Sequence, residues 1–170
     1  MRVLLTIILG GLYFICHGQD ERVSRINNVI RQINKNDKLT ITEFDANEVY
    51  GQVSDGGGII KVYSDKKEII KIEQEIGVSF GRLTTIIYVT AGKPIKIIDR
   101  EEIFKFKDDQ TGWDYTKLTK VFEATIYIFD WDIDDSKVIY NGKRVLSEGT
   151  CSNFEYEPLL ETVQKLIDKR

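Results

Sequence analysis

The sequence has very little histidine, cysteine, methionine or proline. Its 170 residues include one His, one Met, two Cys and two Pro, and Met1, Cys16 and His17 all lie near the N-terminus. The kinds of catalytic and metal site that this scarcity excludes therefore depend on whether the N-terminal residues remain in the mature protein.

Residues 1–18 have the pattern of a secretory signal peptide. A single positive charge, Arg2, precedes the apolar run VLLTIILGGLYFIC, and the small residue Gly18 directly precedes polar sequence. This order of charge, apolar run and small residue is typical of a cleaved export signal. We therefore predict cleavage after Gly18 and a mature protein, periplasmic or secreted, that begins at Gln19.

Two alternatives for this segment are disfavoured. The apolar run is shorter than the roughly 20 residues that span a bilayer, which argues against a permanent membrane helix. Lipidation of Cys16 is disfavoured because Tyr13 and Ile15 stand where a lipoprotein signal usually has Leu and a small residue. We therefore expect no stable membrane span once the signal is removed.

Loss of the signal peptide removes His17 and leaves Cys151 alone. A chain without histidine has no Ser-His-Asp triad, no Cys-His pair, no His-ligated zinc and no imidazole general base. A single cysteine forms no internal disulfide, and Glu148 and Glu155 near Cys151 disfavour a reactive thiolate. The sequence thus predicts a buried, inert Cys151 and no cofactor.

Charges of both signs are interspersed along the chain. The sequence has 24 basic and 27 acidic residues, a net charge of −3 that becomes one unit more negative when Arg2 is lost. A nucleic-acid partner selects for a clustered basic face, and we find none. Pro94 and Pro158 lie far apart and no low-complexity linker occurs, so a single domain is expected over residues 19–170.

Helical periodicity appears at both ends of the mature chain. The first helix is predicted to end near residues 35–37, and the second to carry Pro158 in its first turn. Apolar residues at three- and four-residue spacing give each helix one apolar stripe: Val23, Ile26, Ile30 and Ile33 in the first, and Leu159, Val163, Leu166 and Ile167 in the second.

Between these helices the period changes to two. In EIIKIEQEI the isoleucines Ile70, Ile72 and Ile76 share one side and charged residues the other. Further strands are predicted at 39–44, 59–64, 81–90, 94–106, 121–132 and 137–146, with turns at 64–67, 77–79, 91–93 and 141–142. Such short connections join antiparallel neighbours. The predicted fold class is α+β: an antiparallel meander of about six to eight strands with an N-terminal and a C-terminal α-helix.

Tyrosine precedes several turns that carry lysine: Tyr63-Ser-Asp-Lys, Tyr88-Val-Thr-Ala-Gly-Lys and Tyr140-Asn-Gly-Lys. In the last of these, DSKVIYNGKRVL is predicted to form a strand, a tight Asn141-Gly142 turn and a returning strand. With DGGG at 55–58, the stretch 55–146 resembles small exported bacterial proteins of unknown function built from tandem Tyr/Gly β-hairpins. The resemblance implies architecture and no catalytic residue.

Aromatic residues alternate with aliphatic ones in TIYIFDWDID. Tyr127, Phe129 and Trp131 are expected on one face of this strand, and Ile126 and Ile128 on the other. Tyr88, in RLTTIIYVT, is expected to extend the aromatic face. Such a face is either covered by a terminal helix or open to a partner. Tyr88, Tyr127, Phe129 and Trp131 are therefore the candidate binding residues.

Two stretches resemble ion or phosphate sites and fail on detail. Asp130, Asp132 and Asp134 have the alternate spacing of a calcium loop, but Asp135 replaces the turn glycine and Asn141 the closing glutamate. The three aspartates are therefore only weak metal candidates, and no metal site is predicted. DGGG precedes a strand and lacks the Gly-Lys-Ser/Thr ending, so a turn entering the sheet is expected instead.

Two classes of function remain open. The first is a noncatalytic protein-binding module of the inhibitor, immunity or envelope-accessory type, which binds through an aromatic sheet face or an edge strand. The second is a carboxylate-based hydrolase of envelope or extracellular polymers, which pairs Asp and Glu and needs no histidine. The sequence singles out no such pair, so binding to a protein partner is the favoured interpretation.

Overall fold

The computed structural model describes residues 21–109, 111–149 and 152–169. The predicted signal peptide at 1–18 and Cys151 lie outside the described residues. The chain divides into two compact units, residues 1–37 and 38–170. Over the described part of the chain, no helix is both long and apolar enough to cross a membrane.

The described part of the first unit is one helix. Residues 21–35 are helical, and the Asn36 amide donates to the Ile33 carbonyl at 3.1 Å just beyond the helix end. The apolar periodicity of residues 23–33 predicted this helix and its end near residue 35. An N-terminal helix is therefore confirmed.

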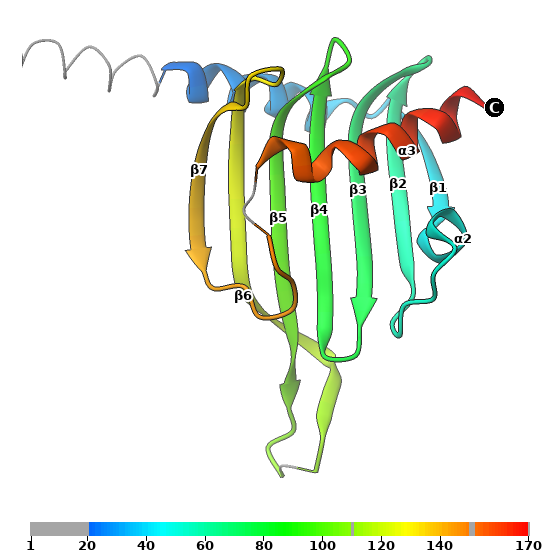
Figure 1. Ribbon diagram of the computed structural model, residues 1–170, viewed down its shortest axis with the longest axis vertical. Helices are drawn as coiled ribbons and strands as arrows, with labels where there is room; N and C mark the ends of the chain where they lie inside the picture. Colours follow the sequence, from blue (N-terminus) through cyan, green and yellow to red (C-terminus); the bar gives the residue numbers. More distant parts are fainter. Residues whose placement is uncertain (1–20, 110, 150–151, 170) are drawn as a thin grey trace, which may run out of the picture. The chain divides into compact units, whose positions relative to one another are not determined.

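The second unit is built on one antiparallel sheet in which every strand pairs with its neighbour in sequence (Figure 1). The connections from β2 onwards are too short for a parallel crossover, and the longer β1–β2 connection, residues 46–57, also joins antiparallel strands. This confirms the predicted α+β class and the predicted strand order. The seven strands are β1 (Thr40–Asp45), β2 (Gly58–Asp65), β3 (Glu68–Val78), β4 (Gly81–Thr90), β5 (Lys93–Phe106), β6 (Trp113–Asp130) and β7 (Asp135–Gly142).

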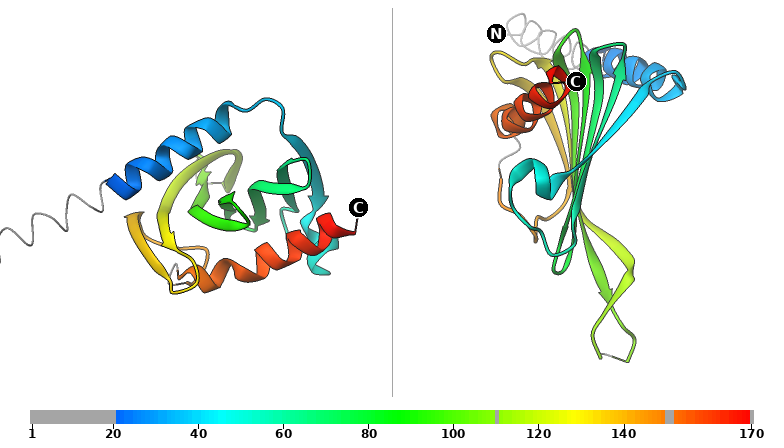
Figure 2. Two further views of the ribbon diagram at one scale, coloured as in Figure 1. Left: turned by 90° about the horizontal axis from the view of Figure 1, so that it is seen from above. Right: turned by 90° about the vertical axis from the view of Figure 1, so that its right-hand side faces the viewer.

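One face of the sheet is covered by the C-terminal helix. After a 3-10 turn, η1 (Asn153–Tyr156), helix α3 (Glu157–Asp168) runs across the strands on that face (Figures 1 and 2). Leu159 and Val163 of α3 are buried there, as its apolar stripe predicted. They pack on a mainly isoleucine layer from the sheet that includes Ile60, Ile72, Ile87, Ile97 and Ile126.

The glycine-rich segment at 55–58 forms a tight turn that leads into β2. A short helix, α2 (Ala46–Tyr50), is capped by the Asp45 carboxylate, which accepts from the Asn47 amide at 2.7 Å. After it, Gly56 packs so closely on Gly77 that a Cβ on Gly56 would lie 2.7 Å from the Gly77 Cα. The expected turn into the sheet is confirmed, and the close approach explains why it needs glycine.

The predicted hairpin at Asn141-Gly142 is wrong. Strand β7 ends at Gly142, and no returning strand follows in residues 143–149. Gly142 has φ +82°, and a Cβ there would meet the Val121 carbonyl oxygen. Lys143 still donates its amide to that oxygen at 3.0 Å. The chain then leaves the sheet, and the amides of Val145 and Leu146 bind a buried carboxylate described below.

Strand β6 is longer than predicted. It begins at Trp113 rather than near residue 121. Strand β4 pairs with β5 only as far as Ile103, and β7 pairs with β6 only from Phe122 onwards. The β5–β6 hairpin beyond these points, residues 104–118, is a two-stranded arm that projects past the rest of the sheet (Figures 1 and 2).

Candidate functional site

Two carboxylates of β5 lie on the buried, α3-covered face of the sheet. Alternation along the strand places Asp99 and Glu101 on the same side as Ile97, which is fully buried. Asp99 has 8% of its surface exposed and Glu101 none. Ionised groups at such positions are costly unless they are paired and hydrogen-bonded.

Glu101 is satisfied by the segment that follows β7. Its Oε2 accepts from the amides of Val145 at 2.7 Å and Leu146 at 2.8 Å. Its Oε1 accepts from the Ser147 hydroxyl at 2.6 Å and lies 3.4 Å from Arg144 Nη1. Burial alone would raise the pKa of Glu101, but these hydrogen bonds and the Arg144 charge outweigh it and lower that pKa.

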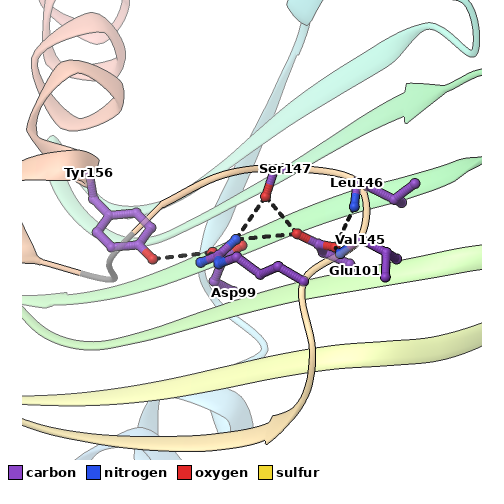
Figure 3. Close-up of polar contacts among 7 residues, drawn as sticks. Asp99, Glu101, Val145, Leu146, Ser147 and Tyr156 are labelled. Carbon is purple, nitrogen blue, oxygen red and sulfur yellow. Dashed lines mark hydrogen bonds and ion pairs between the residues drawn. The ribbon is translucent and has the colours of Figure 1, made fainter.

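Asp99 links the same segment to the start of α3. Its Oδ2 lies 2.5 Å from Arg144 Nη2 and accepts from the Tyr156 hydroxyl at 3.3 Å (Figure 3). The Arg144 guanidinium also lies over the Phe122 ring, 4.4 Å from its centroid. We call Asp99, Glu101, Arg144, Ser147 and Tyr156 the latch, because they hold residues 143–149 and η1 against the sheet.

A cavity of about 580 Å³ opens beside the latch. Its walls come from β3, β4 and β5, from residues 144–149, and from η1 and α3. Apolar side chains, Ile76, Leu83 and Leu159, line part of it, and Asp99, Glu148 and Glu155 supply carboxylates. This volume lies within the range of small-molecule sites, roughly 300–1,000 Å³.

A second hollow of about 450 Å³ lies along α3 near Trp131. Ile69, Val89 and Leu160 line it together with Trp131. Trp131 packs against the buried core on the α3 side, which also contains Ile126 and Ile128. A register shift between Ile128 and Asp130 breaks the alternation of β6. An unbroken alternation predicted Trp131 and Tyr127 on the same face. In the structure Trp131 lies on the α3 side instead.

Tyr88 and Tyr127 lie among charged residues on the other face. Neither belongs to the core that packs on α3, and both are buried. The Lys71 ammonium lies 5.8 Å from the centre of the Tyr88 ring, and Lys96 lies 4.7 Å from that of Tyr127. Phe129, half-buried, lines a small hollow with Pro94 at the β4–β5 turn. The structure thus keeps Tyr88 and Tyr127 on one face, where the register places them on either side of Lys96, and packs Trp131 against the core on the other.

The three weak metal candidates do not form a ligand set. Asp130 Oδ1 accepts from the Asp132 amide at 3.0 Å, and Asp132 forms an ion pair with Lys93 at 2.5 Å. Asp134 accepts from the Ser152 hydroxyl at 3.1 Å. Among the residues that the structure describes, no three His, Cys, Asp or Glu side chains are placed to hold a metal ion.

The arm carries an aromatic cluster that periodicity alone did not single out. Trp113 contacts Phe106 and Phe80, with ring centroids 4.8 and 5.8 Å apart, and Phe104 contacts Tyr115 at 5.1 Å. Phe80 is 56% exposed, Phe106 50% and Tyr115 66%. Four of these five rings belong to the arm and Phe80 to the β3–β4 turn, and we call the five together the aromatic cluster.

The sequence does carry signals for the latch and the cluster. Continued alternation in KPIKIIDREE places Asp99 and Glu101 inward after Ile97, and a charge at an inward position indicates a buried partner. The partner, Arg144, follows β7 and has no such periodicity. In the arm, FKF and WDY have the same alternation of aromatic and charged residues on two nearby segments.

Comparisons of the chain with protein-family models, with curated proteins and with solved structures found no match. The resemblance to Tyr/Gly hairpin proteins therefore stays a prediction. The exposed aromatic cluster is the feature from which a function is proposed below.

Proposed function

We propose that this protein is a noncatalytic protein-binding module that acts after export, in the periplasm or outside the cell, and that its arm contacts the partner. The observation that carries this proposal is the exposure of the aromatic cluster. Phe80, Phe106 and Tyr115 each leave half or more of their surface in water although they lie in ring contacts.

Exposed rings on a ribbon of this kind suit a protein interface. Aromatic side chains bury a large area at a low cost in side-chain entropy and dominate many interface hot spots. The arm has only two strands, and such a ribbon is marginally stable in water on its own. A partner that covers the rings stabilises both the contact and the arm.

The charges around the cluster favour a protein over a membrane or a nucleic acid. The arm carries Lys105, Lys107 and Lys117 interspersed with Asp108, Asp109 and Asp114. Lys117 lies 3.0 Å from Asp114 in an ion pair. Anionic lipid and nucleic acid select for an excess of basic residues, whereas a mixed polar rim around apolar rings is usual at protein interfaces.

The ring surface is a better contact than the edge of the arm. The Asp114 carboxylate accepts from the backbone amide of Thr116 at 3.0 Å, so this amide is not available to an added strand. The pairing of β5 and β6 is also irregular between Phe104 and Lys105. Irregular pairing and lysines on an edge are devices that discourage further strand addition.

The test is affinity capture from the native envelope with the mature protein and three variants. Phe106→Ala and Tyr115→Ala remove rings of the cluster, and Tyr140→Ala removes a similarly exposed ring from β7. We expect a protein held by the wild type and by Tyr140→Ala to be lost from both arm variants. With the purified partner, each arm variant should weaken Kd by about 30-fold, which corresponds to about 2 kcal/mol.

All variants should keep a cooperative melting transition, because the truncated rings are exposed. A partner that binds the arm variants as tightly as it binds the wild type would refute the assignment of the arm.

The carboxylates of the latch give little support to the alternative function, a carboxylate-based hydrolase. A general acid in such an enzyme needs a raised pKa so that it is protonated near neutrality. The pKa of Glu101 is lowered, and Asp99 forms an ion pair with Arg144. These contacts suit a structural role better than proton transfer.

A further inference from the structure

We infer that residues 145–149 form a strap, hinged at Arg144, that opens when Glu101 takes up a proton. Residues 147–149 of the strap form part of the wall of the cavity beside the latch, so opening removes that part of the wall. The inference concerns the face of the sheet that α3 covers and does not involve the arm. It therefore goes beyond the proposed protein contact.

The strap is a part of the fold that can open by itself. No residue of 145–149, all of which the structure describes, lies in a helix or a strand, and none is buried. Val145 leaves 59% of its surface in water, whereas Leu146 is half-buried near Gly81. A segment with few buried apolar contacts opens locally at a lower free energy than core strands do.

One carboxylate binds the middle of the strap and another binds its hinge (Figure 3). Two consecutive backbone amides of the strap and the Ser147 hydroxyl donate to Glu101. Arg144, just before the strap, is also paired with Asp99, which accepts from the Tyr156 hydroxyl of η1. A proton on Glu101 thus weakens the contacts of the strap and leaves the contacts of Asp99 in place.

Protonation changes what Glu101 offers to the strap. A neutral carboxyl carries an O–H donor on one oxygen, where the carboxylate only accepts. The backbone of Glu101 stays paired with β4 and β6, where its neighbours Leu83 and Phe122 are apolar. The titratable and charged groups around it come from the hinge, the strap, β5 and η1: Arg144, Glu148, Asp99, Glu155 and Tyr156.

These surroundings set the direction of the response to pH. Burial raises the pKa of Glu101, but the hydrogen bonds from Ser147 and the strap amides, together with the Arg144 charge, outweigh burial and lower that pKa. When the strap opens, Glu101 meets water and its pKa returns to the ordinary value, about 4.5. The carboxylate therefore holds the strap fully above this value, and the hold is lost as the pH falls through the lowered pKa of the closed form.

The test is hydrogen exchange of the backbone amides of the mature wild-type protein, followed by NMR from about pH 6 to about pH 3. The Val145 and Leu146 amides should be less protected than those of Ile87 and Ile97, which pair within the sheet. Below about pH 4.5 the protection of the strap amides, corrected for intrinsic exchange, should fall by up to about tenfold per pH unit while the core amides remain protected. Equal protection of strap and core at every pH would show that the strap opens only when the whole sheet unfolds, and would overturn the inference.

Two variants show whether Glu101 is the group that responds. Glu101→Gln keeps the size of the side chain and removes its charge. At about pH 7 it should lower the protection of Val145 and Leu146 about 100-fold, which corresponds to about 3 kcal/mol, and acid should lower it no further. Glu102→Gln, outside the latch, should keep the protection and the pH dependence of the wild type. A pH dependence that survives in Glu101→Gln would assign the opening to another group, and the inference would be wrong.

Discussion

At the scale of single residues, Glu101 is central because it is a charged side chain with no solvent contact and four donors around it. Two of these donors are consecutive backbone amides. In a strand returning from Gly142, consecutive amides would point to opposite sides, whereas here one carboxylate oxygen of Glu101 accepts from both. One side chain on β5 thus determines the path of the chain after β7.

Replacing Glu101 with Gln should lower the free energy of unfolding by about 3 kcal/mol or more, as when one partner of a buried ion pair is removed. Each carboxylate oxygen of Glu101 accepts from two donors. In one orientation the NH₂ group of the glutamine faces the Val145 and Leu146 amides, and in the other it faces the Arg144 guanidinium and the Ser147 hydroxyl. Urea unfolding of Glu101→Gln measures the loss.

The neighbouring Glu102→Gln is the matched control, because Glu102 is only partly buried and lies outside the latch. It should change the unfolding free energy by no more than about 0.5 kcal/mol. An equal loss in both variants would show that the latch contributes nothing specific.

The lowered pKa of Glu101 predicts how stability depends on pH. A carboxyl whose folded pKa lies below its unfolded value, about 4.5, stabilises the fold fully above that value, and this contribution is lost as the pH falls through the folded pKa. Unfolding free energies measured between pH 7 and pH 3 should therefore fall more steeply below about pH 4.5 in the wild type than in Glu101→Gln. Identical slopes would contradict the assignment.

At the scale of elements, alternation and turn residues predicted most of the sheet. Strand β4 begins and ends where its apolar alternation does, at Gly81 and Thr90, and α3 buries Leu159 and Val163 of its predicted stripe. These features are local, because they depend on residues within one element and on the face that it buries.

The features that the sequence did not predict depend on contacts between distant segments. The end of β7 is set by Glu101, more than forty residues earlier, through the amides of Val145 and Leu146. The side of Trp131 is set by a register shift opposite β7. Neither a distant hydrogen-bond acceptor nor an extra residue in a strand changes the local pattern of apolar and polar residues. Periodicity alone therefore predicts both the end of β7 and the side of Trp131 incorrectly.

The packing of Trp131 on the α3 side predicts a stability defect rather than a binding defect. Trp131→Ala should lower the free energy of unfolding by about 3 kcal/mol, because the indole packs against the core next to Leu160. Ile133→Ala, at a position 73% exposed in the same turn, should change it by no more than about 0.5 kcal/mol. Thermal or urea unfolding of both variants measures the difference. Loss of partner binding by Trp131→Ala with unchanged stability would restore the original prediction of a binding anchor there.

At the scale of the whole sheet, the core and the proposed partner contact lie in different parts. The α3 face holds the isoleucine core, the latch and the cavity. The arm, in contrast, extends past the points where the pairing of β4 with β5 and of β7 with β6 ends. A surface that is not needed for the core can expose rings to a partner at little cost to the fold. The arm should therefore be removable.

The register shows where to cut. Ile103 and Thr119 face each other across β5 and β6, so replacing residues 104–118 with Asn-Gly leaves them joined by a two-residue hairpin. The shortened protein should unfold cooperatively with a free energy lower by no more than about 1 kcal/mol, because most of the deleted side chains are exposed to solvent. It should also lose the partner that the wild type captures. Urea unfolding and partner capture, measured on the same preparation, separate the two effects. A shortened chain that fails to fold would show that the arm belongs to the structural core. A shortened chain that folds and still binds the partner would place the contact outside the aromatic cluster.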